Sequence, residues 1–349
     1  MNLLRHLLKK NVSTLQSKCQ RILLRAIKLL LQFIPGKMSI SYFSGNQFDG
    51  AGAQLQRLAS IYALSRYLNI EFIKTPLSGV TVHATDPFRT EDDYKQYLTR
   101  VGNFLHQDVL DCNNPDPNCK SMDFIILSAF NLFRIVVLNI FQRDKIHLNV
   151  FQANSIIDSW PKLIADYVSV NKNELRTVNM ETSGVNIVIH YRQGAGGFRV
   201  YPGQKLSRQI EIGIYSKILK KCINQLPSAE PIRITVFTDS PRGETNFIPP
   251  KEQLNQWFGT PGFDGNKITI IPTDFQPIMS FASNQVTVSI EHGGDPLKAF
   301  ILMTQADVLI MSRSSLSYLA GLLNLNGTVY FPINFWHSPL RSWEKFRDE

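Results

Sequence analysis

The pattern of hydrophobic and polar positions is clearest in the second half of the chain, from residue 185 onward. Short continuous apolar runs, typical of strands buried on both faces of a parallel sheet, alternate there with segments in which apolar residues recur every three or four positions. The runs predict strands at 186–190, 232–238, 267–271, 286–290, 307–311 and 328–331. The periodic segments predict helices at 208–226, 251–258, 296–305 and 315–323. This order favours a doubly wound parallel sheet.

The first half shows a similar but less regular alternation. A strand at 38–44, a glycine-containing loop at 45–52, a helix at 53–68 and a strand at 70–73 form a predicted βαβ unit. Beyond it, the pattern predicts a strand at 145–151 and helices at 91–105, 122–141 and 155–170. The polar stretch 171–184 shows no clear period and is interpreted as a linker. We therefore expect two α/β domains, at 38–175 and 185–349.

Residues 1–37 form a separate N-terminal segment with the pattern of an amphipathic helix. Its basic residues Arg21, Arg25 and Lys28 fall on a different face from the apolar series Leu4, Leu8, Val12, Leu15, Cys19, Ile22, Ala26, Leu30 and Phe33. The apolar stretch is too short and too charged to span a bilayer. The pattern favours a helix that lies on an anionic membrane surface. A helix packed on the protein's own body and an organellar transit peptide are the alternatives.

Length and charge narrow the class of protein. A chain of 349 residues predicts about two domains, and 44% hydrophobic and 19% charged residues are ordinary for a globular enzyme. The net charge of +9 is local, because residues 1–37 hold eight Lys or Arg and no Asp or Glu, which leaves +1 for the remainder. A nearly neutral body argues against nucleic acid as a partner. Without a secretory cleavage pattern, we expect a cytoplasmic protein that is peripheral on the membrane surface.

The cysteines give no sign of a metal site. Four of them, Cys19, Cys112, Cys119 and Cys222, are scattered along the chain, and no partnering His or second CxxC motif accompanies them. Cys112 and Cys119 enclose a short polar loop and are a possible disulfide pair, but reduced structural thiols are the favoured interpretation. We therefore predict no metal ligands.

The segment 186–197, NIVIHYRQGAGG, is the strongest candidate for chemistry. A predicted buried strand runs directly into a glycine-rich loop, with His190 and Arg192 at its mouth. Gly194 and the glycines after it allow the backbone to approach a phosphate closely, and the guanidinium of Arg192 can grip phosphate oxygens in two places. An ordinary strand-to-helix turn with a solvated arginine is the alternative.

Two further strand ends carry polar groups suited to the same ligand. Asp239 ends the predicted strand 232–238 and can accept hydrogen bonds from a ribose or base, or it can simply cap the next turn. The segment SRSSLS, 312–317, stands between a strand and a helix whose free N–H groups can hold a phosphate, although Ser314 can also merely cap that helix. Since the carboxyl ends of parallel strands open on one side of a sheet, the three loops can meet around one diphosphate.

These segments resemble a known enzyme family. HYRQGAGG, then FTD, then ADVLIMSRSSLSYLAGLLNLNGTVYFP are similar to the donor-binding half of the fucosyltransferase superfamily that contains alpha-1,2-, alpha-1,6- and protein O-fucosyltransferases, and GNQ at 45–47 is similar to the opening loop of the alpha-1,2 members. The resemblance implies a GT-B architecture, with two Rossmann-like domains facing a cleft. It also implies inverting, metal-independent transfer of fucose from GDP-fucose, with no other cofactor, to a glycan or glycolipid hydroxyl.

The resemblance also assigns roles to individual residues. It implies that Arg192 grips the donor diphosphate, that His190 shapes the same pocket and that Asp239 lies near the guanosine. The phosphate and sugar would be lined by Ser314, Ser315 and Ser317. The sequence departs from the alpha-1,2 pattern at Gln193, where those enzymes have a second Arg, and at Ala195, where they have Asp. These departures leave the donor sugar and the linkage open.

The mechanism expected from these residues is direct displacement at the anomeric carbon. Arg192 and the helix that begins at Ser315 would stabilise the departing diphosphate. Asp49, in the first glycine-containing loop, is the candidate general base, with Asp295 and Glu291 as further candidates. Two other functions remain open: a GT-B transferase for another nucleotide sugar, and a non-catalytic carbohydrate-binding protein associated with the membrane.

Overall fold

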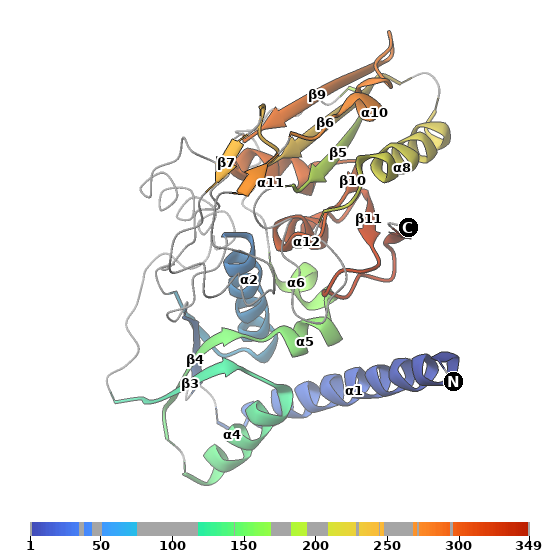
Figure 1. Ribbon diagram of the computed structural model, residues 1–349. Coiled ribbons are helices and arrows are strands. Elements are labelled where there is room, and N and C mark those ends of the chain that lie inside the picture. Colours follow the sequence, from blue (N-terminus) through green and yellow to red (C-terminus); the bar gives the residue numbers. More distant parts are fainter. Residues whose placement is uncertain are drawn as a thin grey trace. The chain divides into compact units, whose positions relative to one another are not determined.

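A computed structural model describes residues 2–34, 38–43, 51–74, 118–142, 144–168, 183–193, 209–227, 230–243, 245–247, 268–270, 272–293 and 296–347 (Figure 1). The described residues fall into two compact units. Unit 1 contains those up to residue 168 together with His337–Leu340, and unit 2 contains those from 183 to 336 and from 341 onward. Each unit has its own parallel sheet, so the predicted α/β class is confirmed. The predicted helices at 91–105 and 251–258 lie outside the described residues, as does nearly all of the linker.

Unit 1 is built on a four-stranded sheet with the order β2-β1-β4-β3, in which every neighbouring pair is parallel. Its strands are β1 (Met38–Tyr42), β2 (Glu71–Ile73), β3 (Lys120–Ile126) and β4 (Ile146–Gln152). Helix α2 (Ala51–Leu68) packs on β1, β2 and β4 and completes the predicted βαβ unit. It ends at Asn69, which adopts the left-handed conformation (φ 55°) that commonly terminates a helix.

Two elements of unit 1 differ from the sequence-based expectation. The segment 122–141, predicted as one helix, is instead the end of strand β3 followed by helix α4 (Ala129–Gln142). The predicted helix at 155–170 is two short helices, α5 (Asn154–Ser159) and α6 (Lys162–Tyr167), separated at Trp160 and Pro161. A proline has no N–H to donate within a helix, so the break at this point has a local cause.

The N-terminal segment forms helix α1 (Asn2–Leu31), which is part of unit 1. Leu24, Ile27, Leu31 and Ile34 are buried, and the helix packs on α4, α5 and α2. Lys28 places its ammonium 4.6 Å from the ring centroid of Tyr67 in α2. Among the described residues, no helix is both long and apolar enough to cross a membrane. Packing on the protein's own body, one of the alternatives from the sequence, therefore accounts for one face of α1.

Unit 2 is built on a six-stranded parallel sheet with the order β12-β11-β10-β5-β6-β9. Its strands are β5 (Val185–Tyr191), β6 (Ile232–Thr238), β9 (Val286–His292), β10 (Val308–Ile310), β11 (Thr328–Pro332) and β12 (Glu344–Phe346). In chain order this is 3-2-1-4-5-6, the strand order of a Rossmann fold. The predicted strand at 267–271 is not part of this sheet, because β8 (Ile268–Ile270) pairs antiparallel with β7 (Thr245–Phe247).

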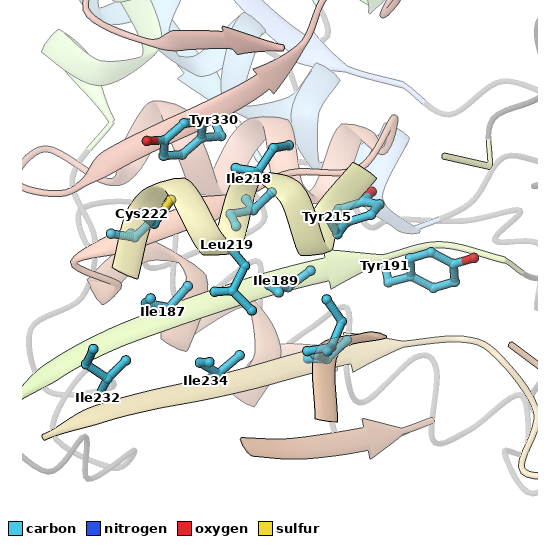
Figure 2. Close-up of a cluster of buried hydrophobic side chains, with 14 of the residues drawn as sticks. Ile187, Ile189, Tyr191, Tyr215, Ile218, Leu219, Cys222, Ile232, Ile234 and Tyr330 are labelled. Carbon is cyan, nitrogen blue, oxygen red and sulfur yellow. The ribbon is translucent and has the colours of Figure 1, made fainter. Parts of the chain in front are cut away.

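Helices lie against both faces of the unit 2 sheet. Helix α8 (Ile212–Gln225) covers one face through Tyr215, Leu219 and its neighbours, which pack on Ile187 and Ile189 of β5 (Figure 2). A short helix, α10 (Gln276–Met279), packs beside α8. Helix α11 (Pro296–Gln305) packs on β5 and on α12 (Ser315–Leu323). Because side chains alternate along a strand, His190 shares the parity of Val188 and faces away from α8.

Candidate functional site

The strand order of unit 2 marks one point of the sheet as a binding site. The chain proceeds from β5 outward through β6 and β9, then returns to the other side of β5 with β10 and proceeds through β11 and β12. The order therefore reverses between β5 and β10. In open parallel sheets, ligands bind outside the carboxyl ends of the strands at such a reversal. The segments that leave β5 and β10 at this end are the two whose motifs the sequence had singled out.

A hydrogen bond joins these two segments. Nδ1 of His190, at the end of β5, lies 2.7 Å from Oγ of Ser312, which follows β10. The two residues are 122 positions apart in the chain, and Ser312 is almost completely buried. The HxR segment and the serine-rich turn therefore meet at one place, as the convergence of strand ends predicted.

Arg192 follows β5 directly and is positioned beside the reversal. Its side chain is only 17% exposed, and its Nε lies 3.9 Å from Oδ2 of Asp239. This distance allows charge attraction but is too long for a hydrogen bond, and the buried Nε has no hydrogen-bond partner among the described residues. A mostly buried guanidinium with an unsatisfied donor is costly unless an anion completes its hydrogen bonds.

Asp239 has a structural role that the sequence did not predict. Its Oδ1 accepts a hydrogen bond of 2.6 Å from the backbone N–H of Gln193, so the end of β6 fixes the start of the loop after β5. The side chain of Gln193 accepts a hydrogen bond from Thr273, which also donates to the hydroxyl of Tyr191 at 3.2 Å. Gln193, one of the departures from the alpha-1,2 pattern, thus holds the start of the loop after β5 in place.

Burial and charge keep His190 neutral at physiological pH. Desolvation and, after it, the cation of Arg192 lower the pKa of His190 to about 4, with Asp239 acting in the opposite direction. A neutral imidazole either accepts from or donates to the Ser312 hydroxyl, depending on which ring nitrogen carries the proton. Of His190 and Arg192, only Arg192 is therefore a cation at this pH, and neutral His190 connects the loop after β5 to the turn after β10.

The serines at the start of α12 divide into structural and accessible groups. Ser314 is the N-cap and accepts from the N–H of Leu316 at 3.3 Å, the capping role weighed in the sequence. The buried hydroxyl of Ser317 donates to the carbonyl oxygens of Ser312 and Ser314, at 3.2 and 3.1 Å. Ser315, the first residue of the helix, is half-buried. Of the three serines, Ser315 therefore stays the candidate for direct contact with a ligand at the N-terminus of α12.

Arg313 is a second buried cation at this site, and sequence reasoning missed it. Its side chain is 3% exposed, and burial lowers its pKa, with a smaller opposing influence from the Tyr215 phenol. Tyr215 in turn lies 3.4 Å from the carbonyl oxygen of Met311, to which its hydroxyl donates. The available signal was an arginine between a buried strand and a buried helix, where the rest of the turn is serine.

The remaining candidates are separate from this cluster or outside the described residues. Asp49, Gly194 and Asp295 lie outside the described residues. Glu291, near the end of β9, has its carboxylate 3.6 Å from the ammonium of Lys298 and is partly exposed. The described residues contain no cluster of three His, Cys, Asp or Glu arranged to hold a metal ion.

No protein-family model matches the sequence, and comparison with curated protein sequences finds no match. Solved structures with distant similarity include NodZ alpha-1,6-fucosyltransferase soaked with GDP-fucose (14% identity, TM-score 0.36, covering 83% of this chain and 93% of that one). Another is E. coli ADP-heptose LPS heptosyltransferase II (12% identity, TM-score 0.36, covering 89% of each chain). A third is POFUT1 in complex with GDP (9% identity, TM-score 0.41, covering 90% of this chain and 99% of that one). Similarities of this size do not assign an activity to this chain.

Proposed function

We propose that the protein is a nucleotide-sugar-dependent glycosyltransferase, and more narrowly that it transfers fucose from GDP-fucose to a glycan or glycolipid hydroxyl. Transfer would proceed with inversion and without a metal ion. The nucleotide-sugar assignment rests on the site between β5 and β10. The choice of fucose rests on the resemblance of HYRQGAGG and the SRSSLS segment to fucosyltransferases.

One observation carries the nucleotide-sugar assignment: Arg192 is a mostly buried cation with an unsatisfied Nε, beside the reversal of strand order. The N-terminus of α12 belongs to the segment that the His190–Ser312 hydrogen bond ties to the end of β5. A fork of guanidinium donors and a helix N-terminus together suit a diphosphate, which carries charge on both phosphates. A structural arginine would instead have its donors satisfied by the protein.

The proposed reaction is a single displacement. The acceptor oxygen forms a bond to the anomeric carbon from the face opposite the diphosphate, and the bond from that carbon to the phosphate oxygen breaks. The diphosphate departs with the electron pair, and Arg192 and the start of α12 stabilise its charge. A carboxylate takes the proton of the acceptor hydroxyl, for which Asp49, Asp295 and Glu291 stay candidates.

Release of nucleoside diphosphate from a panel of GDP-, UDP- and ADP-sugars tests this proposal. The full-length protein is the right material, because α1 contributes buried side chains to unit 1. We expect release from GDP-fucose, and a loss of about 100-fold in Arg192→Ala. Arg192→Lys, which keeps the charge but not the fork of donors, should recover only part of the rate.

Arg233→Ala is the matched control, because it removes the same charge from unit 2 at a different place. Arg233 stands near the amino end of β6, where its guanidinium donates to the carbonyl oxygen of Ser183. It should keep nearly full activity. Equal activity of the Arg192→Ala and Arg233→Ala variants would contradict the proposal that Arg192 binds the donor diphosphate. Release from another donor would move the assignment to that sugar, and no binding of any donor would favour a non-catalytic carbohydrate-binding protein.

A further inference from the structure

Large apolar side chains are exposed mainly on one part of unit 1. Among the described residues, twelve large hydrophobic side chains are exposed, and eight of them belong to α1, its C-terminal end, β3 and α4. These eight are Ile22, Leu29, Phe33, Ile125, Ile126, Phe130, Leu138 and Phe141. Scattered single apolar residues are normal on a protein surface, whereas a concentration of them marks an interaction site.

Helix α1 has two apolar stripes on opposite sides. Leu24, Ile27 and Leu31 form the buried stripe, which packs on unit 1. The second stripe is exposed and recurs every three or four positions, as Lys18, Ile22, Arg25, Leu29 and Phe33. The expected separation of Arg25 from the face of Ile22 and Phe33 was therefore wrong. Phe33 is 77% exposed, although its side chain is among the most apolar. Packing among the described residues therefore explains one stripe of α1 and leaves the other exposed.

Helix α4 repeats this arrangement. Its inner face is buried, and its outer face carries Phe130, Arg134, Leu138 and Phe141 at helical spacing. Phe141 is 81% exposed. Because α4 packs against α1 within unit 1, the two exposed stripes belong to neighbouring helices (Figure 1). We call the exposed residues of these two stripes the α1–α4 surface.

The charge of the α1–α4 surface identifies its partner. Lys18, Arg25 and Arg134 lie within the stripes, while neither α1 nor α4 contains an acidic residue. Apolar side chains interspersed with uncompensated cations fit an anionic lipid leaflet, where the apolar groups enter the headgroup boundary and the cations meet lipid phosphates. In a contact between two copies of this face, cations would meet cations, because neither helix carries an acidic residue, whereas protein interfaces pair complementary charges.

We propose that the α1–α4 surface docks the protein on an anionic membrane leaflet, with both helices lying in the interface. This goes beyond the proposed transfer reaction and does not depend on it. It also extends the expected membrane contact from residues 1–37 to α4, which begins only at residue 129. The membrane-facing cations and aromatic rings would then come from two helices held together by the fold of unit 1.

Sedimentation of the full-length protein with vesicles tests the proposal. We expect binding to vesicles of phosphatidylcholine and phosphatidylglycerol, with binding at least about tenfold weaker to phosphatidylcholine alone and at high salt. The double variant Phe33→Ser/Phe141→Ser should weaken binding by about tenfold or more, because two inserted rings are lost. Both side chains are largely exposed, so the variant is expected to fold.

Leu325→Ser is the matched control, since Leu325 is 72% exposed and belongs to unit 2 rather than to the α1–α4 surface. Its binding should stay within about twofold of the unaltered protein. Equal binding to neutral and anionic vesicles, or unchanged binding of the double variant, would overturn the proposal. Absence of vesicle binding would also overturn the proposal. If sedimentation velocity then showed dimers of the unaltered protein and of Leu325→Ser but monomers of the double variant, the surface would be a contact between two copies of the chain.

Discussion

At the scale of single residues, the buried imidazole of His190 should make the stability of unit 2 depend on pH. The pKa of His190 is about 4 in the folded protein and near 6.5 in an unfolded chain, so the folded state binds fewer protons between these values. Stability from the neutral imidazole is present above pH 6.5 and is lost as the pH falls toward 4. The unaltered protein should lose roughly 1–3 kcal/mol more than His190→Gln across this range.

Urea unfolding at several pH values between 7 and 4 measures this difference. The pKa of His147, buried in the unit 1 sheet, is also lowered by desolvation and acts in the same direction. It is unchanged in His190→Gln, so its contribution cancels when the two proteins are compared. Parallel pH profiles for the two proteins would show that His190 is not the titrating group.

Candidate residues could be predicted from the sequence where residue type and position next to a predicted strand or helix were sufficient. His190, Arg192 and Ser314 were found because their residue types follow predicted strands and precede predicted helices. The bond from His190 to Ser312 was not predictable, because it spans 122 positions and depends on which strands are neighbours. Arg313 was missed because a charged residue in a turn is usually solvated, and only the fold reveals that this one is buried.

At the scale of elements, the position of α12 depends on the turn that follows it. The side-chain amide of Asn324 donates to the carbonyl oxygens of Met303 and Ala306, at 3.0 and 2.8 Å, and its oxygen accepts from the N–H of Gly327 at 2.8 Å. A Cβ on Gly327 would lie 2.1 Å from the carbonyl oxygen of Ala306. Backbone atoms would have to move to admit even one methyl group, and α12 and β11 would move with them.

Gly327→Ala is therefore expected to destabilise unit 2 by about 2–4 kcal/mol, because the clash is with backbone rather than with a flexible side chain. Gly243→Ala is the control, since nothing lies within 4 Å of its added Cβ, and it should change stability by less than about 0.5 kcal/mol. Thermal unfolding of both variants provides the measurement. Equal melting temperatures for the two variants would mean that the turn after α12 does not hold the element in place.

The elements of unit 2 were more predictable than those of unit 1 for a physical reason. Helices α11 and α12 begin and end where the sequence pattern placed them, because short segments that contain Ser, Asn, Asp or Gly separate each helix from its flanking strands. The boundary between β3 and α4 was missed because Ile125, Ile126 and Leu127 continue without a break into an apolar helix. A signal was present at Ser128, whose hydroxyl accepts a hydrogen bond from the N–H of Asn131 as an N-cap does.

At the scale of the whole molecule, alternating strands and helices predicted the α/β class but not the strand order. The apolar runs that form β5, β6 and β10 are similar in composition, and only their pairings decide which of them are neighbours. The reversal between β5 and β10 follows from that order, and the location of the site follows from the reversal. The facing of two domains across a cleft, which the resemblance implied, stays a prediction.

The whole-molecule role of α1 leads to a final prediction about truncation. Leu24, Ile27, Leu31 and Ile34 are buried within unit 1, and burial of each such side chain contributes about 1.5–3 kcal/mol. Their combined loss would rival the total stability of a typical domain, about 5–15 kcal/mol. Protein lacking residues 1–34 should therefore be insoluble or lack a cooperative unfolding transition. A removable targeting segment, by contrast, would leave the fold intact.

Removal of residues 1–16 alone is the matched comparison, because it leaves all four buried side chains in place. This shorter truncation should unfold cooperatively and keep the activity of the full chain, with weaker binding to anionic vesicles because Arg5, Lys9 and Lys10 are lost. Circular dichroism during heating distinguishes the two proteins. If both melt as the full chain does, α1 is an appended segment, because a helix that completes the core of unit 1 cannot be deleted without loss of the fold.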